Sequence, residues 1–160
     1  MSTMITFDFL PETIEEFMNI PESGCRTPYE VAAMTVLACL RYVDDPVEGE
    51  EMLNVLKGPK PLNAFDKQFL RDRLTGKDYV PRSYLKGTSP ENDYEPSKPY
   101  VIEILENPYS FANDGSAKLY IRSSGADSPR PIVLRQNKDG TWYLFENLLL
   151  ADIRKPESFT

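Results

Sequence analysis

The sequence predicts an α+β domain, with about four N-terminal helices packed on a C-terminal four-stranded antiparallel meander sheet. Helix-start signals and apolar residues at helical spacing fill residues 1–85. Residues 86–99 form a polar, proline-rich connection. From residue 100 to residue 156, apolar and polar residues alternate as they do in half-buried strands. The length of 160 residues is typical of one domain, so we expect residues 1–160 to form a single domain with these two halves.

Two capping signals mark the first helices. Residues 5–11 are expected to be extended, and a short helix should follow Thr13, because a glutamate three residues later completes a capping box. Thr27 and Glu30 repeat this signal, with a proline at the first helical position. The helix that they start, running from Pro28 to about Tyr42, is apolar around nearly its whole circumference. We therefore expect this helix to occupy the centre of the core.

Two further helices are expected before residue 85. One begins at Asp45-Pro46 and stops at Gly58-Pro59. The other runs from about Asn63 to Leu74, where Gly76 is placed to adopt a left-handed conformation after the helix. Together with the first two helices, they give the predicted total of about four.

Four segments show the two-residue periodicity of strands: residues 100–106, 118–123, 131–136 and 141–148. Residues 137–140, Asn-Lys-Asp-Gly, form a good tight turn between the last two segments, which predicts their antiparallel pairing. Glu103 lies in the first strand on the same face as apolar neighbours. We expect this carboxylate to pair with a cross-strand arginine or lysine.

The residue counts exclude several chemistries. The chain has no histidine and only two cysteines, Cys25 and Cys39. Ser-His-Asp and Cys-His catalysis, histidine-ligated metals, four-cysteine zinc sites and iron–sulfur clusters are therefore excluded. Adjacent carboxylates on helices do not face one point, so they make poor acid–base or metal pairs. We expect no catalytic residues, no metal site, no cofactor and no enzymatic activity.

Charge and hydropathy bear on partners and location. Residues 1–60 carry 4 basic and 11 acidic side chains, whereas residues 61–160 carry 14 of each, which gives a net charge of −7. This balance disfavours nucleic acid and anionic membrane surfaces as partners. The longest apolar stretch, residues 31–40, is too short to span a bilayer, and no secretory signal is visible. We expect a cytoplasmic protein.

The loop between the second and third predicted strands is the main candidate site. It combines hydroxyl side chains, a glycine and arginines, the groups that bind carboxylate or phosphate. Residues 116–138 contain five basic side chains and one acidic side chain. The candidate ligand-binding residues are Arg122, Ser123, Ser124, Asp127, Ser128, Arg130 and Arg135. The alternative interpretation is structural: the serines and Asp127 hold a tight connection, and the arginines lie on a solvated sheet face.

Two other features allow alternative interpretations. Cys25 precedes the helix at Pro28 and is either a reactive thiol influenced by the helix dipole or an inert packed residue. Trp142 points to one face of the last strand, and Tyr143 and Phe145 point to the other. The second sheet face is then either a ligand groove or partner surface, or it is covered by the connection 86–99.

The chain resembles an uncharacterised family of single-domain bacterial proteins. The resemblance rests on the motifs at residues 62–63, 68–73, 77–81 and 90–94, the loop Arg-Ser-Ser-Gly-Ala-Asp-Ser-Pro-Arg-Pro at 122–131, Trp142, and the closing residues 152–156. It covers nearly the whole chain. It implies a bacterial, cytoplasmic, single-domain protein and no activity, ligand or catalytic residue.

These observations favour a non-enzymatic binding domain. We expect the exposed sheet face and the 123–131 loop to bind another protein. The alternative is a small anionic ligand, bound or slowly turned over without histidine at the same loop.

Overall fold

The computed structural model describes residues 1–159. Within these residues there are five strands, five α-helices and three short 3-10 turns. The elements are β1 Ser2–Phe7, α1 Ile14–Asn19, α2 Pro28–Asp44, α3 Pro46–Lys57, α4 Ala64–Leu74, α5 Tyr79–Arg82, β2 Tyr100–Leu105, β3 Ser116–Ile121, β4 Arg130–Gln136 and β5 Trp142–Asn147. The predicted α+β class is confirmed.

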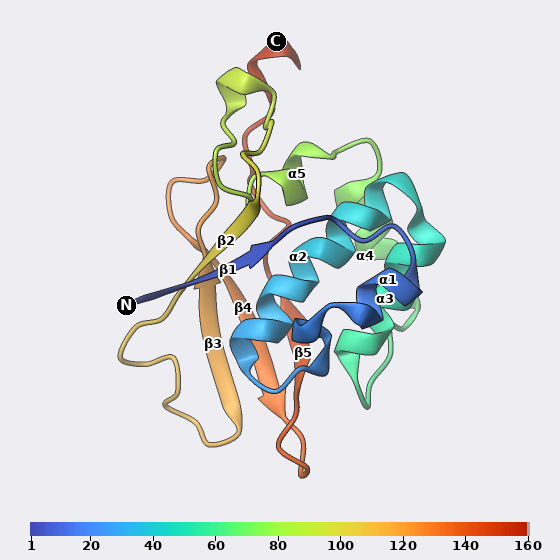
Figure 1. Cartoon of the computed structure of the whole chain (residues 1–160), viewed down its shortest axis with the longest axis vertical. Helices are drawn as coiled ribbons and strands as arrows, with labels where there is room; N and C mark the ends of the chain where they lie inside the picture. Colours follow the sequence, from blue (N-terminus) through green and yellow to red (C-terminus); the bar gives the residue numbers. More distant parts are fainter. Residues whose placement is uncertain (160) are drawn as a thin grey trace.

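The molecule has two layers. The strands form one antiparallel sheet in the order β1-β2-β3-β4-β5, and the helices lie on one side of it (Figure 1). Strand side chains that point to the helices are buried, including Ile102, Leu119 and Leu134. One hydrophobic core therefore joins the helical half to the sheet half.

Helix α2 lies at the centre of this core, as predicted. Thr27 and Glu30 form the capping box at its start, with Pro28 in the first turn. The consecutive residues 31–39 are all buried, so the helix is enclosed on every side. At the earlier predicted helix start, Thr13 caps α1 by accepting from the backbone N–H of Glu16. The Glu16 carboxylate accepts from the backbone N–H of Glu12 and not from that of Thr13, so only half of the predicted capping box forms.

The predicted count of four strands is wrong, because the N-terminal segment is a fifth strand. Residues Ser2–Phe7 pair antiparallel with β2, with Ile5 opposite Ile102 and Phe7 opposite Tyr100. This segment was expected only to be extended. Its partner lies about 95 residues away in the sequence, and periodicity does not report such long-range pairing.

The predicted count of about four helices omits α5. This helix has four residues and contains Pro81, so it shows neither the length nor the periodicity of a helical signal. The bounds of the second predicted strand also differ: this strand, β3, covers Ser116–Ile121 rather than 118–123.

The connection 86–99 does not cover the aromatic end of the sheet. It extends past the end of β2 and lies beside the C-terminal segment (Figure 1). Tyr94 donates to the carbonyl of Arg154 at 2.6 Å, and Ser158 donates to Asp93 at 2.6 Å. The expectation that this connection covers the aromatic residues is therefore wrong. The Phe145 ring lies under Arg135 instead, at 3.4 Å from the guanidinium carbon to the ring centroid.

The contact between α2 and α3 yields a first prediction. A Cβ atom on Gly49 of α3 would lie 2.4 Å from the Cα of Tyr42, so Gly49→Ala must push the two helices apart. We expect the free energy of unfolding in urea to fall by about 2–3 kcal/mol, although alanine favours helix. In Gly24→Ala, the added Cβ meets only the Arg26 side chain at 3.5 Å, and the change should stay within about 0.5 kcal/mol. Equal stability of the two variants would contradict the close packing.

Candidate functional site

The sheet face that points away from the helices is open to solvent (Figure 1). We call this surface the outer face, and it is defined by Met4, Val101, Glu103, Leu105, Lys118, Tyr120, Arg122, Pro131, Val133 and Arg135. These positions alternate with the buried residues of the same strands. The two-residue periodicity of the sequence thus correctly separates the two faces of β2, β3 and β4.

An apolar row crosses the centre of the outer face. Leu105 of β2 lies opposite Tyr120 of β3, and Tyr120 lies opposite Pro131 of β4. All three side chains are half-buried by their neighbours on the sheet. Their alignment depends on strand register, so sequence reasoning did not find this row, although it assigned each residue to a strand or its edge.

Charged side chains border the apolar row. Glu103 accepts from Arg122 at 3.1 Å and lies 3.7 Å from the Lys86 ammonium, which confirms the predicted cross-strand pairing of Glu103. Lys118 and Arg135 are exposed on the other side of the row. The outer face carries three bases, Lys118, Arg122 and Arg135, against Glu103 and the exposed Glu146 of β5, which lies opposite Val133. This small basic excess contrasts with the net charge of −7 for the whole chain.

Ser123 and Ser124 of the loop form hydrogen bonds with the segment that follows α5. Ser123 is buried; its hydroxyl donates to Ser83 Oγ at 2.7 Å and accepts from the Gly125 N–H at 3.2 Å. The Ser124 hydroxyl lies 2.8 Å from that of Thr88. Both serines therefore make the structural hydrogen bonds that one of the two interpretations expected.

The other candidate residues lie apart from the serines. Arg130 donates to the carbonyls of Ala151 and Asp152, at 3.1 and 3.0 Å. Asp127 pairs with Arg154 at 2.8 Å. These contacts tie the loop to the C-terminal segment.

Ser128 and Arg135 complete the set. Ser128 is exposed at the loop, while Arg135 lies near the far end of β4 against Phe145. The structure thus brings together only Arg122, Ser123 and Ser124 from the seven candidates.

These three residues line a hollow of about 370 Å³ with Lys86, Thr88 and Glu103. Two cations and several hydroxyls in one hollow are the groups that an anion requires. The Glu103 carboxylate, however, contacts both cations and offsets their charge. Lys86 was missed as a site residue because it reaches Glu103 from outside the sheet.

Neither cysteine is an activated nucleophile. Burial, with a smaller contribution from the Glu30 carboxylate, raises the pKa of Cys25 to about 11. Burial raises the pKa of Cys39 to about 12. Both thiols are protonated at neutral pH, so for Cys25 the inert, packed interpretation holds and the helix dipole does not dominate.

The described residues contain neither a membrane-spanning helix nor a cluster of metal ligands. No helix within residues 1–159 is both long and apolar enough to cross a membrane. The same residues contain no group of three or more cysteine, aspartate or glutamate side chains arranged to hold a metal ion.

The fold defines a class: a two-layer α+β domain with helices on one face of a five-stranded antiparallel sheet. Residues 9–157 match the family described as Domain of unknown function (DUF6935), and the chain belongs to this family. The resemblance to an uncharacterised family is thereby confirmed. No curated protein and no solved structure matches the chain.

The buried loop serine gives a second prediction. Ser123→Ala leaves the buried N–H of Gly125 without its acceptor and removes the donor to Ser83. We expect a loss of about 1–2 kcal/mol in the free energy of unfolding, measured in urea. The exposed Ser128→Ala is the matched control and should stay within about 0.5 kcal/mol. If both variants unfold like the wild type, the loop serine has no structural role.

The raised thiol pKa values give a third prediction. The folded state keeps both thiols protonated, whereas the unfolded state ionises them from about pH 9. Their contribution to stability is therefore complete below pH 9 and is lost as the pH rises toward the folded-state values of about 11 and 12. Urea unfolding measured across this range should show a shallower loss for Cys39→Ala than for the wild type. Identical slopes would mean that Cys39 is not kept protonated by the fold.

Proposed function

We propose that the protein is a non-enzymatic interaction domain whose outer face binds an acidic surface of another protein. The observation that carries this proposal is the apolar row of Leu105, Tyr120 and Pro131, bordered by basic side chains, on a face that no helix covers. Apolar residues at the centre and charges at the rim are typical of protein interfaces.

Charge supports the choice of an acidic partner. Lys86, Lys118, Arg122 and Arg135 border the row, and Glu103 offsets part of their charge. In a chain with net charge −7, the basic excess on this face favours an acidic partner there. Arg122 directly precedes the 123–131 loop, whose hydrogen bonds to Ser83 and to the C-terminal segment anchor the end of β3.

Catalysis is not part of the proposal. The sequence has no histidine, the thiols are protonated, and the loop serines donate to or contact neighbouring hydroxyls rather than a base. An interaction domain needs none of these groups to be activated.

The test compares charge-reversal variants of the full chain. The tagged protein is used as bait in lysate of its native cell, and each captured protein is purified and titrated by biolayer interferometry. We expect Lys118→Glu with Arg135→Glu to weaken binding at least about tenfold, and added salt to weaken wild-type binding. Lys60→Glu with Lys155→Glu, two exposed positions outside the outer face, is the matched control and should bind like the wild type.

Two results would overturn the proposal. One is that every captured protein binds the outer-face variant as well as it binds the wild type. The other is that charge reversal strengthens binding, which would mean that the partner surface is basic.

The smaller hollow near Ser124 is the place where an anionic ligand would bind instead. A thermal-shift measurement with inorganic phosphate tests this alternative, because a ligand that binds only the folded state raises the melting temperature. A rise that Arg122→Gln removes would favour the anion site. An unchanged melting temperature at millimolar phosphate would count against the anion site and leave the outer face as the proposed site.

A further inference from the structure

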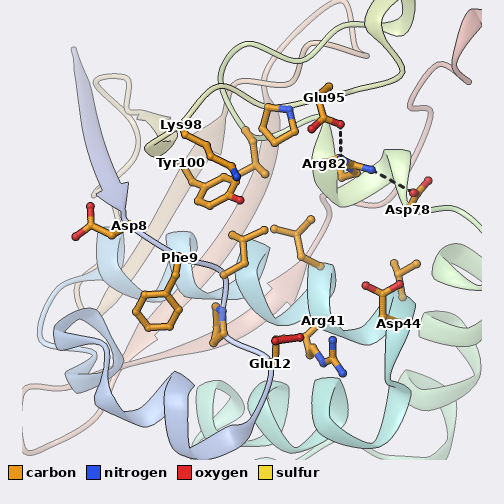
Figure 2. A pocket seen from close by; sticks show the side chains of 16 residues that line it. Asp8, Phe9, Glu12, Arg41, Asp44, Asp78, Arg82, Glu95, Lys98 and Tyr100 are labelled. Atoms are coloured by element: carbon orange, nitrogen blue, oxygen red, sulfur yellow. Dashed lines mark hydrogen bonds and ion pairs between the residues drawn. The ribbon is translucent and has the colours of Figure 1, made fainter.

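A second hollow, of about 650 Å³, lies outside the outer face (Figure 2). It opens between residues 8–12 after β1, the last turns of α2, helix α5 and residues 95–100. Leu40 and Val43 of α2 and Leu85 after α5 give it an apolar lining. Charged side chains, among them Arg41, Asp44 and Arg82, also line it (Figure 2). This volume is in the range of small-molecule sites, which combine apolar walls with a few polar groups. We call it the α2 cleft.

Arg41 is a partly buried cation of the α2 cleft with unused hydrogen-bonding capacity. Its side chain is 22% exposed, and its Nη2 reaches Asp45 only at 3.5 Å. Its buried Nε has no hydrogen-bond partner within the described part of the chain. A guanidinium group binds a carboxylate best through two parallel N–H donors, and this arginine does not make such a pair within the protein. The Nε is too enclosed for a ligand to reach, but Nη1 makes no hydrogen bond within the described residues and is not buried, so this end of the guanidinium group can bind a carboxylate of a ligand.

The α2 cleft also holds carboxylates without ion pairs. Asp8, Glu12 and Asp44 are exposed at its rim, and none of them forms an ion pair with residues 1–159. Asp44 follows Arg41 by three positions on α2 and could have paired with it, but Arg41 turns to Asp45 instead. These carboxylates can accept from an ammonium group.

The remaining charges of the α2 cleft are either paired or at its rim. Arg82 contacts Asp78 at 3.4 Å and Glu95 at 3.2 Å, so its charge is offset (Figure 2). Lys98 is exposed at the edge. A purely anionic ligand would meet an excess of acids here, and a purely cationic ligand would leave Arg41 without an acceptor.

We propose that the α2 cleft binds a small zwitterion with an apolar body, namely an apolar amino acid or short peptide. Its carboxylate pairs with Arg41, its ammonium group with Asp44, and its apolar part packs on Leu40, Val43 and Leu85. The positions of Arg41 and Asp44, one helical turn apart, set the two charges side by side on one wall. This site is separate from the outer face and does not depend on it.

Isothermal titration calorimetry on the full chain tests the proposal with four probes: leucine, the dipeptide Leu-Leu, N-acetyl-Leu-Leu and Leu-Leu-amide. We expect leucine or Leu-Leu to bind, and either cap on the dipeptide to weaken binding at least about tenfold, since each cap removes one charge. Arg41→Gln should weaken the free dipeptide about tenfold and leave the amide unaffected. Asp44→Asn should weaken the free dipeptide about tenfold and leave binding of the N-acetylated dipeptide unaffected. Such non-additivity identifies direct contact between the paired groups.

The matched controls are Arg26→Gln and Asp114→Asn, which change exposed residues outside the α2 cleft and should bind Leu-Leu like the wild type. Asp44 is exposed, so its variant should fold even if Arg41→Gln does not. Three results would overturn the proposal. One is that leucine and Leu-Leu show no binding at millimolar concentration in the calorimeter, and another is that the capped dipeptides bind as tightly as the free one. The third is that the losses of binding free energy caused by a cap and by the matching substitution are additive.

Discussion

The need to enclose helix α2 on all sides organises the whole molecule. Its residues 31–39 are buried without interruption, so no single layer of structure can cover them. The sheet covers one side, and α3, α4, α5 and the 3-10 turn Pro21–Gly24 cover the others. Burial of each large apolar side chain contributes about 1.5–3 kcal/mol, which makes this enclosure a main source of stability. It also explains why Gly49 stands where α3 crosses Tyr42, since a larger residue would hold the two helices apart.

Enclosing α2 also requires that distant parts of the chain be held together at the end of the sheet. The Tyr84 hydroxyl donates to the carbonyl of Leu149, and Tyr94 donates to that of Arg154. Arg130 adds two hydrogen bonds to the same C-terminal segment, and a Cβ on Gly125 would lie 2.5 Å from the Tyr94 hydroxyl. The serine- and arginine-rich loop is therefore a junction among three segments. This role accounts for its hydroxyls and its glycine without a bound ligand.

Local signals predicted most of the fold, and long-range pairing accounts for what they missed. Thr27, Pro28 and Glu30 identify the start of α2 because a cap depends on residues three positions apart. Nothing local in residues 2–7 specifies that they pair with β2, and strand register likewise decides that Leu105, Tyr120 and Pro131 form one row. The loop residues were found from their chemistry, but whether their hydroxyls face a ligand or Ser83 depends on the position of α5. Arg41 gave no signal at all, because an arginine near the end of a helix is ordinary until its Nε is seen to be buried.

Successive side chains of β2 point to opposite faces of the sheet, which allows one small domain to present two separate surfaces, the α2 cleft and the outer face. Tyr100 lines the α2 cleft, whereas Val101 and Glu103 belong to the outer face. β2 pairs with β1 along its whole length and with β3 at Ile104 and Leu105, so its backbone separates the two surfaces. Acidic residues concentrated in the first 60 positions surround the cleft, and the bases of β3 and β4 lie across the sheet. Because separate side chains line the two surfaces, Lys118 and Arg135 can be reversed without touching Arg41 or Asp44. Each proposal can therefore fail while the other stands.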